Sequence, residues 1–325
     1  MSFDAALEQV KSFPKQFVQG IEVAKEIIVE KPLQGVGFCG MGGSALAAEI
    51  IKAYLEEINF PLPVFIFRSY ELPNFVNKNY LIFCISYSGN TEETISMFKD
   101  GIRKKAQIVT MSTSGILKEL AKKHQVPWIE LPKGFQPRLG IGFMLFSCLK
   151  VLENSGFTID LENELGLLEF VSWEKNIEKA KKLVERINKV PIIYATKRFL
   201  PVAKIWKALI NECSKMHCFV NEISEINHNE MVGFVKSKDF FVIILQDYGD
   251  HYRMKRRMSL LQELLNEEKI KNIMLAITGA SFLVRALSTV HLGMHLALEL
   301  AKRNNVDPEK VDMIEKFKKK LGKFI

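Results

Sequence analysis

Short apolar runs alternate with amphipathic segments along the first half of the chain. The runs are rich in β-branched and aromatic residues and predict strands at residues 35–39, 63–67, 80–86, 107–111 and 127–131. Apolar residues at helical spacing predict helices over residues 4–28, 44–57, 91–104, 117–124 and 143–154. The run LIFCIS is apolar at almost every position, as expected when helices cover both faces of a sheet. This alternation predicts βαβ units and a parallel sheet.

The same layout restarts in the second half. We predict strands at residues 191–195, 240–245 and 272–278, and helices over residues 174–188, 201–215, 251–268, 282–304 and 308–321. Residues 156–173 suit a connection between domains. The chain is therefore expected to be an α/β protein with two domains, at residues 1–155 and 156–325. The second half lacks the glycine loops of the first, so we expect it to have kept the fold and lost the ligand site.

The composition indicates a globular protein of the cytoplasm. Of the 325 residues 48% are hydrophobic and 25% charged, and the first residues contain no apolar run typical of a signal peptide. The most apolar stretch, residues 281–301, contains Arg285, His291, His295 and Glu299, which favours a buried helix over a membrane span. Five cysteines without a CxxC pair suit reduced thiols.

The net charge of +8 raises the question of nucleic acid. The basic residues are spread over helix faces with acids between them, and no aromatic-rich basic motif accompanies them. We therefore expect no nucleic-acid partner and no membrane partner, and an anionic small molecule fits the charge as well.

The run GMGGS, which includes Gly42, Gly43 and Ser44, directly follows a predicted strand and starts a predicted helix. Glycines let backbone amides approach a ligand, and a helix N-terminus attracts anions. A tight turn that needs glycine only for its geometry is an alternative. A dinucleotide site is disfavoured because the spacing breaks GxGxxG and the next strand ends in Arg68 rather than an acid. A nucleotide P-loop would require GK[ST].

The second loop, SYSGNTEET, is more specific. Ser86 and Ser88 alternate after a strand, so we expect their hydroxyls to point the same way, and Thr91 is placed to cap the next helix. Three hydroxyls and several amides at one helix N-terminus suit a phosphate monoester. An ordinary capped turn is the alternative.

These two loops together resemble the sugar isomerase (SIS) domain, whose hydroxyl-rich loop binds the phosphate of phosphosugars. Two such halves, with the later motifs NE (residues 211–212) and NHN (residues 227–229), look like the bifunctional phosphoglucose/phosphomannose isomerase family over nearly the whole chain. The resemblance implies two SIS-type three-layer αβα sandwiches, each with a mainly parallel sheet, and a homodimer. It also implies interconversion of glucose 6-phosphate and fructose 6-phosphate through a cis-enediol, with mannose 6-phosphate as a further candidate substrate.

Aldose–ketose isomerisation needs a base that moves a proton between C1 and C2, a group that opens the ring, and a cation beside the developing oxyanion. By resemblance Glu212 is the base, and His228 opens the ring, reaching the site of a partner subunit. Arg138, in the run KGFQPR, matches the arginine near the enediolate oxygen. Lys318 matches a lysine that aids ring opening, although neighbouring lysines blur its register.

Two departures from the family pattern affect the substrate. The family usually has a threonine seven residues before that lysine, implicated in accepting mannose phosphates, where this chain has Val311. Leu139 and Gly140 stand where small residues normally follow the Pro-Arg pair. Both put the activity on mannose 6-phosphate in doubt more than the reaction type.

No cofactor or metal is expected. His291 and His295 lie four residues apart, but without an HExxH glutamate or a third ligand they suit a core or interface. Cys213, beside Glu212, is interpreted as a buried thiol rather than a nucleophile. A different class also stays open: a phosphosugar sensor without catalysis, although no helix-turn-helix precedes residue 35. A glucosamine-phosphate synthase would need an N-terminal cysteine glutaminase domain.

Overall fold

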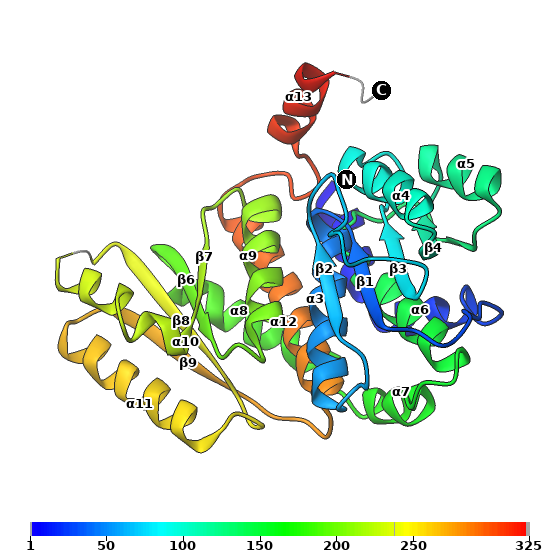
Figure 1. The fold of residues 1–325 in the computed structure, drawn as a ribbon. Coiled ribbons are helices and arrows are strands. Elements are labelled where there is room, and N and C mark those ends of the chain that lie inside the picture. Colours follow the sequence, from blue (N-terminus) through cyan, green and yellow to red (C-terminus); the bar gives the residue numbers. More distant parts are fainter. Residues whose placement is uncertain (1, 237, 323–325) are drawn as a thin grey trace. The chain divides into compact units, whose positions relative to one another are not determined.

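The computed structural model describes residues 2–236 and 238–322, which form two compact units (Figure 1). The five-stranded unit comprises Lys11–Gly166 and the residues from Met313 on. The four-stranded unit comprises the residues up to Val10 and Leu167–Asp312. Each unit is a parallel sheet with helices on its faces, which confirms the predicted α/β class.

The sheet of the five-stranded unit has the order β2-β1-β3-β4-β5, and every pair is parallel. Its strands are β1 (Gly35–Cys39), β2 (Val64–Phe67), β3 (Tyr80–Ile85), β4 (Gln107–Ser112) and β5 (Trp128–Glu130). Its helices are α2 (Lys15–Glu22), α3 (Gly42–Glu57), α4 (Glu92–Arg103), α5 (Gly115–His124), α6 (Ile141–Asn154) and α7 (Leu161–Glu169), which contains the boundary between the units.

Both faces of this sheet are covered, which explains why its strands are apolar throughout. On one face Ile82 and Ile108 form a buried cluster with Phe98 of α4 and Leu117 of α5. On the opposite face Phe38 stacks on Phe83 at 5.0 Å between ring centroids, while α2 and α3 pack against α6. The carboxyl ends of β1 and β3 are adjacent, so the two loops singled out in the sequence begin at neighbouring points.

The sheet of the four-stranded unit has the order β7-β6-β8-β9 and is also parallel. Its strands are β6 (Val190–Ala195), β7 (Phe219–Glu222), β8 (Phe240–Asp247) and β9 (Lys271–Ile277). Its helices are α1 (Ser2–Lys11), α8 (Trp173–Arg186), α9 (Leu200–Ser214), α10 (Ile223–Ile226), the 3₁₀ helix η1 (Glu230–Val235), α11 (Tyr252–Glu267) and α12 (Phe282–Arg303). The last helix, α13 (Asp312–Leu321), belongs to the five-stranded unit from Met313 on.

The second sheet repeats the order of the first without a fifth strand. The helices α8 and α9 pack against α12, as α2 and α3 pack against α6 in the other unit. On the opposite face Met258, Leu261 and Leu265 of α11 join a buried cluster with Val242 and Ile244 of β8. The repeated topology confirms the two similar α/β halves expected from the sequence.

Several elements differ from the prediction, and α10 and η1 were not predicted at all. The helix predicted over residues 4–28 is two helices, because a turn at residues 12–14, ending in Pro14, separates α1 from α2. The connection predicted at residues 156–173 contains α7. The strand β7 was not predicted, because FVNE is short and none of its residues is fully buried.

The helix α12 is buried along most of its length, and its histidines belong to the core, as predicted. His291 is 2% exposed, and its ring lies 5.1 Å from that of Trp173 and 4.6 Å from that of His295. Burial, and to a lesser extent His295, lowers the pKa of His291 to about 3. Among the described residues no group of three or more His, Cys, Asp or Glu side chains could hold a metal ion, and no helix is long and apolar enough to cross a bilayer.

The neutral state of His291 makes the stability of the protein depend on pH. The pKa of a histidine in the unfolded chain is about 6.5, so acid protonates the unfolded form while folded His291 stays neutral. The stability that depends on neutral His291 is therefore fully present above pH 6.5 and is lost as the pH falls toward 3. We expect this residue to lower the free energy of unfolding by about 2 kcal/mol between pH 8 and pH 5. Urea unfolding at both pH values should show a smaller decrease for His291→Gln, and equal decreases would contradict the assignment.

Candidate active site

The second loop of the five-stranded unit is organised around the hydroxyl of Ser86. This side chain is 1% exposed, and its Oγ donates to Thr91 Oγ1 at 2.8 Å. The same Oγ accepts from the backbone N–H groups of Gly89 at 3.1 Å and Thr91 at 3.3 Å. Ser86 therefore closes the turn at the N-terminus of α4 and fixes its amides in one conformation.

Thr91 and Ser88 take different positions from those expected. Thr91 is the N-cap residue of α4, but its side chain does not cap the helix and accepts from Ser86 instead. The strand ends at Ile85, before Ser86, so Ser86 and Ser88 do not alternate on a strand. Ser88 is exposed and its Oγ accepts from Asn90 N at 3.3 Å. The loop thus offers an exposed hydroxyl and the first amides of a helix that carries Glu92 and Glu93 in its first turn.

The first loop lies beside the second. Gly42 has φ +50° and is exposed, whereas Gly43 and Ser44 are buried in the first turn of α3. The Oγ of Ser44 accepts from the backbone N–H of Tyr87 at 3.3 Å, which joins the two loops directly. Two helix N-termini, those of α3 and α4, therefore converge at the carboxyl ends of β1 and β3, a favourable place for an anion.

The loop that contains Arg138 closes against these two. A Cβ added to Gly43 would lie 2.7 Å from Arg138 N and 2.8 Å from Pro137 O, so only glycine permits this approach. Tyr87 Oη donates to Pro132 O at 2.6 Å and accepts from Phe135 N at 3.0 Å. The structure thus brings Arg138 together with the phosphate-loop residues within one unit.

Arg138 itself is deeply buried for a charged residue. It is 2% exposed, and its guanidinium donates to Gln136 Oε1 at 3.3 Å. The next residue is held as well, because Gln16 Nε2 of α2 donates to Leu139 O at 2.8 Å. The loop therefore carries a buried cation whose planar set of donors suits an oxyanion.

Gly89 is the least replaceable residue of the second loop. Its φ is +74°, and a Cβ would lie 1.8 Å from Ser114 O, in the turn before α5. We expect Gly89→Ala to lower the free energy of unfolding by about 2 kcal/mol and the affinity for a phosphate ester about 10-fold. Gly134→Ala is the matched control, because Gly134 also has a positive φ, +91°, but open space around it. Urea unfolding and titration calorimetry should separate the two variants; equal losses would attribute the effect to backbone strain alone.

Glu212 lies in the last turn of α9, in the four-stranded unit. It is half-buried, and the preceding Asn211 accepts from Cys218 N at 2.9 Å through its Oδ1, which fixes the end of the helix. Cys213 is buried, in agreement with a thiol in the core. Glu212 is therefore a partly accessible carboxylate at a helix end whose backbone is fixed by Asn211.

His228 follows β7 in a loop whose other residues are held by hydrogen bonds to neighbouring elements. His228 itself is exposed, and Glu230 accepts from Tyr194 Oη at 2.6 Å and from Asn221 Nδ2. Burial, together with the Glu230 carboxylate, raises the pKa of Tyr194, so the phenol remains a donor. Arg257 of α11 donates to Asn227 Oδ1 at 3.1 Å. The exposed imidazole thus sits on a loop with fixed ends.

Glu212 and His228 lie toward opposite ends of the second sheet. The helix α9 starts after the carboxyl end of β6, and the chain then enters β7, which runs parallel to β6. Glu212 therefore precedes β7 and His228 follows it, with four strand residues between, on the order of 10 Å. Glu212 is thus on the side where β7 begins and His228 on the side where β7 ends.

Lys318 and Val311 belong to the C-terminal segment. Every described residue from Asp312 on is exposed, including Lys318 on α13. Val311 is half-buried just before this helix. The match of Lys318 to the family lysine and its role in ring opening both stay predictions.

The ends of β6 and β8 correspond to the phosphate-loop positions of the other unit, and there the four-stranded unit places a carboxylate. Asp247, the last residue of β8, is 0% exposed and accepts from Arg198 and, at 2.6 Å, from Arg285 Nε. Thr196 donates to Asp250 Oδ1 at 2.6 Å in the same cluster. The two guanidiniums at this end of the second sheet are thus paired with a carboxylate of the protein itself.

Two αβα sandwiches with a hydroxyl-rich loop at the carboxyl ends of the strands define an SIS-domain protein. Residues 176–321 match the bacterial phospho-glucose isomerase C-terminal SIS domain. In fold the chain is similar to a hypothetical protein from Thermus thermophilus, with a TM-score of 0.76, 14% identity, and coverage of 98% of this chain and 90% of the other.

Relatives that are similar in sequence show which family within the SIS-domain class the chain belongs to. The chain is 36% identical to a bifunctional phosphoglucose/phosphomannose isomerase from Aquifex aeolicus, over 97% of each chain. It is also 27% identical to a D-glucosamine-6-phosphate 4-epimerase from Sulfolobus acidocaldarius, over 92% of each chain. The protein belongs to the bifunctional phosphoglucose/phosphomannose isomerase family.

Proposed function

We propose that the protein is an aldose–ketose isomerase that interconverts glucose 6-phosphate and fructose 6-phosphate. The observation that carries this proposal is the packing of the Arg138 loop against Gly43, beside the helix N-termini of α3 and α4. A sugar phosphate held by its phosphate at those termini has a fixed cation within the same unit. Membership of the isomerase family supports the choice of reaction.

The proposed chemistry assigns each step to one group. Glu212 takes the proton from C2 of the open-chain aldose and returns it to C1, passing through a cis-enediolate, while a second proton passes from the C2 hydroxyl to the C1 oxygen. Arg138 stabilises the negative charge that develops on the enediolate oxygen. Ring opening moves a proton to the ring oxygen, for which we assign His228 with Lys318 as an aid.

We propose that His228 acts in the site of a second copy of the chain. The support is its position at the end of the sheet opposite to Glu212, on an exposed loop with anchored ends. The active form would then be a homodimer with two composite sites. Mixing Glu212→Gln and His228→Ala subunits should restore up to about a quarter of the activity if the two residues serve one site from different chains.

The proposal is tested with a coupled assay of the purified protein. We expect turnover of glucose and fructose 6-phosphates, unchanged by EDTA. Glucosamine 6-phosphate belongs in the panel because one relative is named as an epimerase of that sugar. Binding of phosphosugars without any turnover would identify a sensor and refute the proposal.

Mannose 6-phosphate is expected to react more slowly than glucose 6-phosphate, or not at all. Val311 cannot donate or accept a hydrogen bond where the family usually has a threonine. Val311→Thr should therefore raise kcat/KM for the mannose ester about 10-fold and change that for the glucose ester less than 3-fold, since one hydrogen bond contributes about 1 kcal/mol. Val306→Thr, an equal change elsewhere in this segment, is the control. Efficient turnover of mannose 6-phosphate by the unaltered protein would contradict this prediction.

A further inference from the structure

The strand β9 is the edge strand of the four-stranded sheet, at the edge where the sheet of the other unit has a fifth strand. In the five-stranded unit β4 pairs with β3 on one side and with β5 on the other. In the four-stranded unit β9 holds the place of β4, and β8 is its one partner among the described residues. The outer edge of β9 therefore presents backbone groups that a further strand could pair with.

The side chains of β9 show the effect of this missing strand. In β4 all residues after Gln107 are buried, whereas in β9 only Ile277 is buried. The segment from Asn272 to Ile277 is NIMLAI, without a charged residue. Edge strands are commonly protected by charges on the strand itself, whereas β9 carries a single charge, Lys271 at its first position, and none from Asn272 on.

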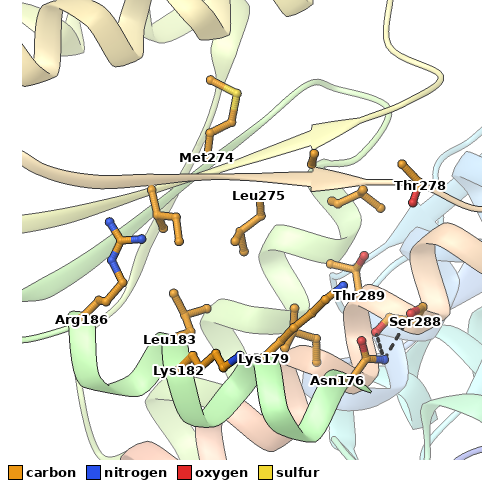
Figure 2. Close-up of a pocket in the computed structure, with 14 residues that line it drawn as sticks. Asn176, Lys179, Lys182, Leu183, Arg186, Met274, Leu275, Thr278, Ser288 and Thr289 are labelled. Atoms are coloured by element: carbon orange, nitrogen blue, oxygen red, sulfur yellow. Dashed lines mark hydrogen bonds between the residues drawn. The ribbon is translucent and has the colours of Figure 1, made fainter. Parts of the chain in front are cut away.

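A cavity of about 330 Å³ lies beside β9, between the strand and the helices α8 and α12 (Figure 2). Leu275 points toward Leu183 of α8, while Met274 points to the opposite side of the strand (Figure 2). Ile273 and Leu292 also line the cavity, and Asn176 and Ser288 close one end with a hydrogen bond. The cavity has an apolar floor where side chains of an added strand would point.

The rim of the cavity is basic. Lys179, Lys182 and Arg186 of α8 line it, and no carboxylate among the described residues does. The guanidinium of Arg186 donates to Asn272 O of β9 at 3.1 Å, so this cation borders the strand itself. The charge of the rim favours an acidic occupant.

We propose that β9 binds an extended segment of a partner protein that carries both apolar and acidic residues at alternate positions, on the one face that it turns toward the cavity. The segment would pair with β9 as a fifth strand, place its apolar side chains in the cavity and its carboxylates beside Lys179 and Lys182. A second copy of this chain is disfavoured as the occupant, since pairing β9 with β9 would bring two basic rims together. This surface lies on the four-stranded unit and is independent of the proposed isomerase reaction.

The test uses a fluorescently labelled octapeptide with valine and glutamate in turn at the odd positions and threonine at the even ones, titrated with the full-length protein and followed by anisotropy. We expect saturable binding, with amide NMR shifts concentrated in β9. The same peptide with lysine in place of each glutamate should bind at least 10-fold more weakly. The same glutamate peptide with N-methyl groups on alternate amides should not bind, because it cannot complete the strand pairing.

Variants locate the site on the protein. The double variant Lys179→Glu/Lys182→Glu changes two exposed side chains, so it should fold, and it should weaken binding about 10-fold or more. Lys122→Glu/Lys123→Glu, on exposed residues of α5, is the control and should bind normally. No binding at millimolar peptide, equal binding of the N-methylated peptide, or binding blocked by self-association of the chain through β9 would each overturn the proposal.

Discussion

Replacement of Glu212 by glutamine should lower kcat for the glucose 6-phosphate to fructose 6-phosphate reaction by about 10²–10⁴-fold. Glutamine keeps the shape and the polarity of the side chain but cannot accept a proton, so the loss measures general base catalysis. KM should change less than about 3-fold, because the phosphate loops and Arg138 are untouched. Steady-state kinetics in both directions would provide both constants.

Glu185→Gln is the matched control for this variant, since Glu185 is an exposed glutamate on α8 and its change is chemically identical. The control should retain full activity. Turnover within a few fold of normal in Glu212→Gln would remove this residue from the mechanism. A variant with unchanged kcat and a raised KM would instead make Glu212 a binding group.

Replacement of Arg138 by methionine should lower kcat by about 10²–10³-fold, the range measured when one stabiliser of an oxyanion is lost. Methionine has a similar length and suits a site that is 2% exposed. Guanidinium ion should restore part of the lost kcat in Arg138→Ala, whose short side chain leaves the position open, because that position is lined by groups that already accept from a guanidinium, such as Gln136. A role in loop structure alone would give no such rescue.

Arg138→Lys keeps the charge and loses the planar set of donors. We expect its kcat to lie between those of the methionine variant and the unaltered protein. Thermal unfolding of both variants should show whether the loop against Gly43 is intact. A kcat unaffected in Arg138→Met would contradict the assignment of this residue to the enediolate.

Much of the fold could be predicted from the sequence because local signals and tertiary packing agree. The strand β1 ends where expected, since buried strands of a parallel sheet are apolar on both faces and glycines follow directly. The GMGGS and SYSGNTEET loops could be placed together for a related reason, because the strands before them were predicted in one parallel sheet, where they are neighbours; phosphate binding by these loops stays a prediction. The match of SYSGNTEET to an SIS loop narrowed the function further.

Other features depend on contacts between distant residues, which no local pattern records. The role of Ser86 as the centre of the second loop depends on Thr91, and the closeness of Gly43 to Arg138 joins residues 95 positions apart. The strand β7 was missed because its hydrogen bonds to β6, rather than its composition, define it. The separation of Glu212 from His228 followed only once β7 was known to lie between them.

The buried cluster of Asp247, Arg198 and Arg285 bears on how a duplicated sandwich can specialise. An internal carboxylate permanently satisfies both guanidiniums, so free phosphate or substrate has no exchangeable position to enter there. The two sandwiches therefore share a topology but differ at these strand ends, where one has two loops that lead into helix N-termini and the other has an internal cluster of ions.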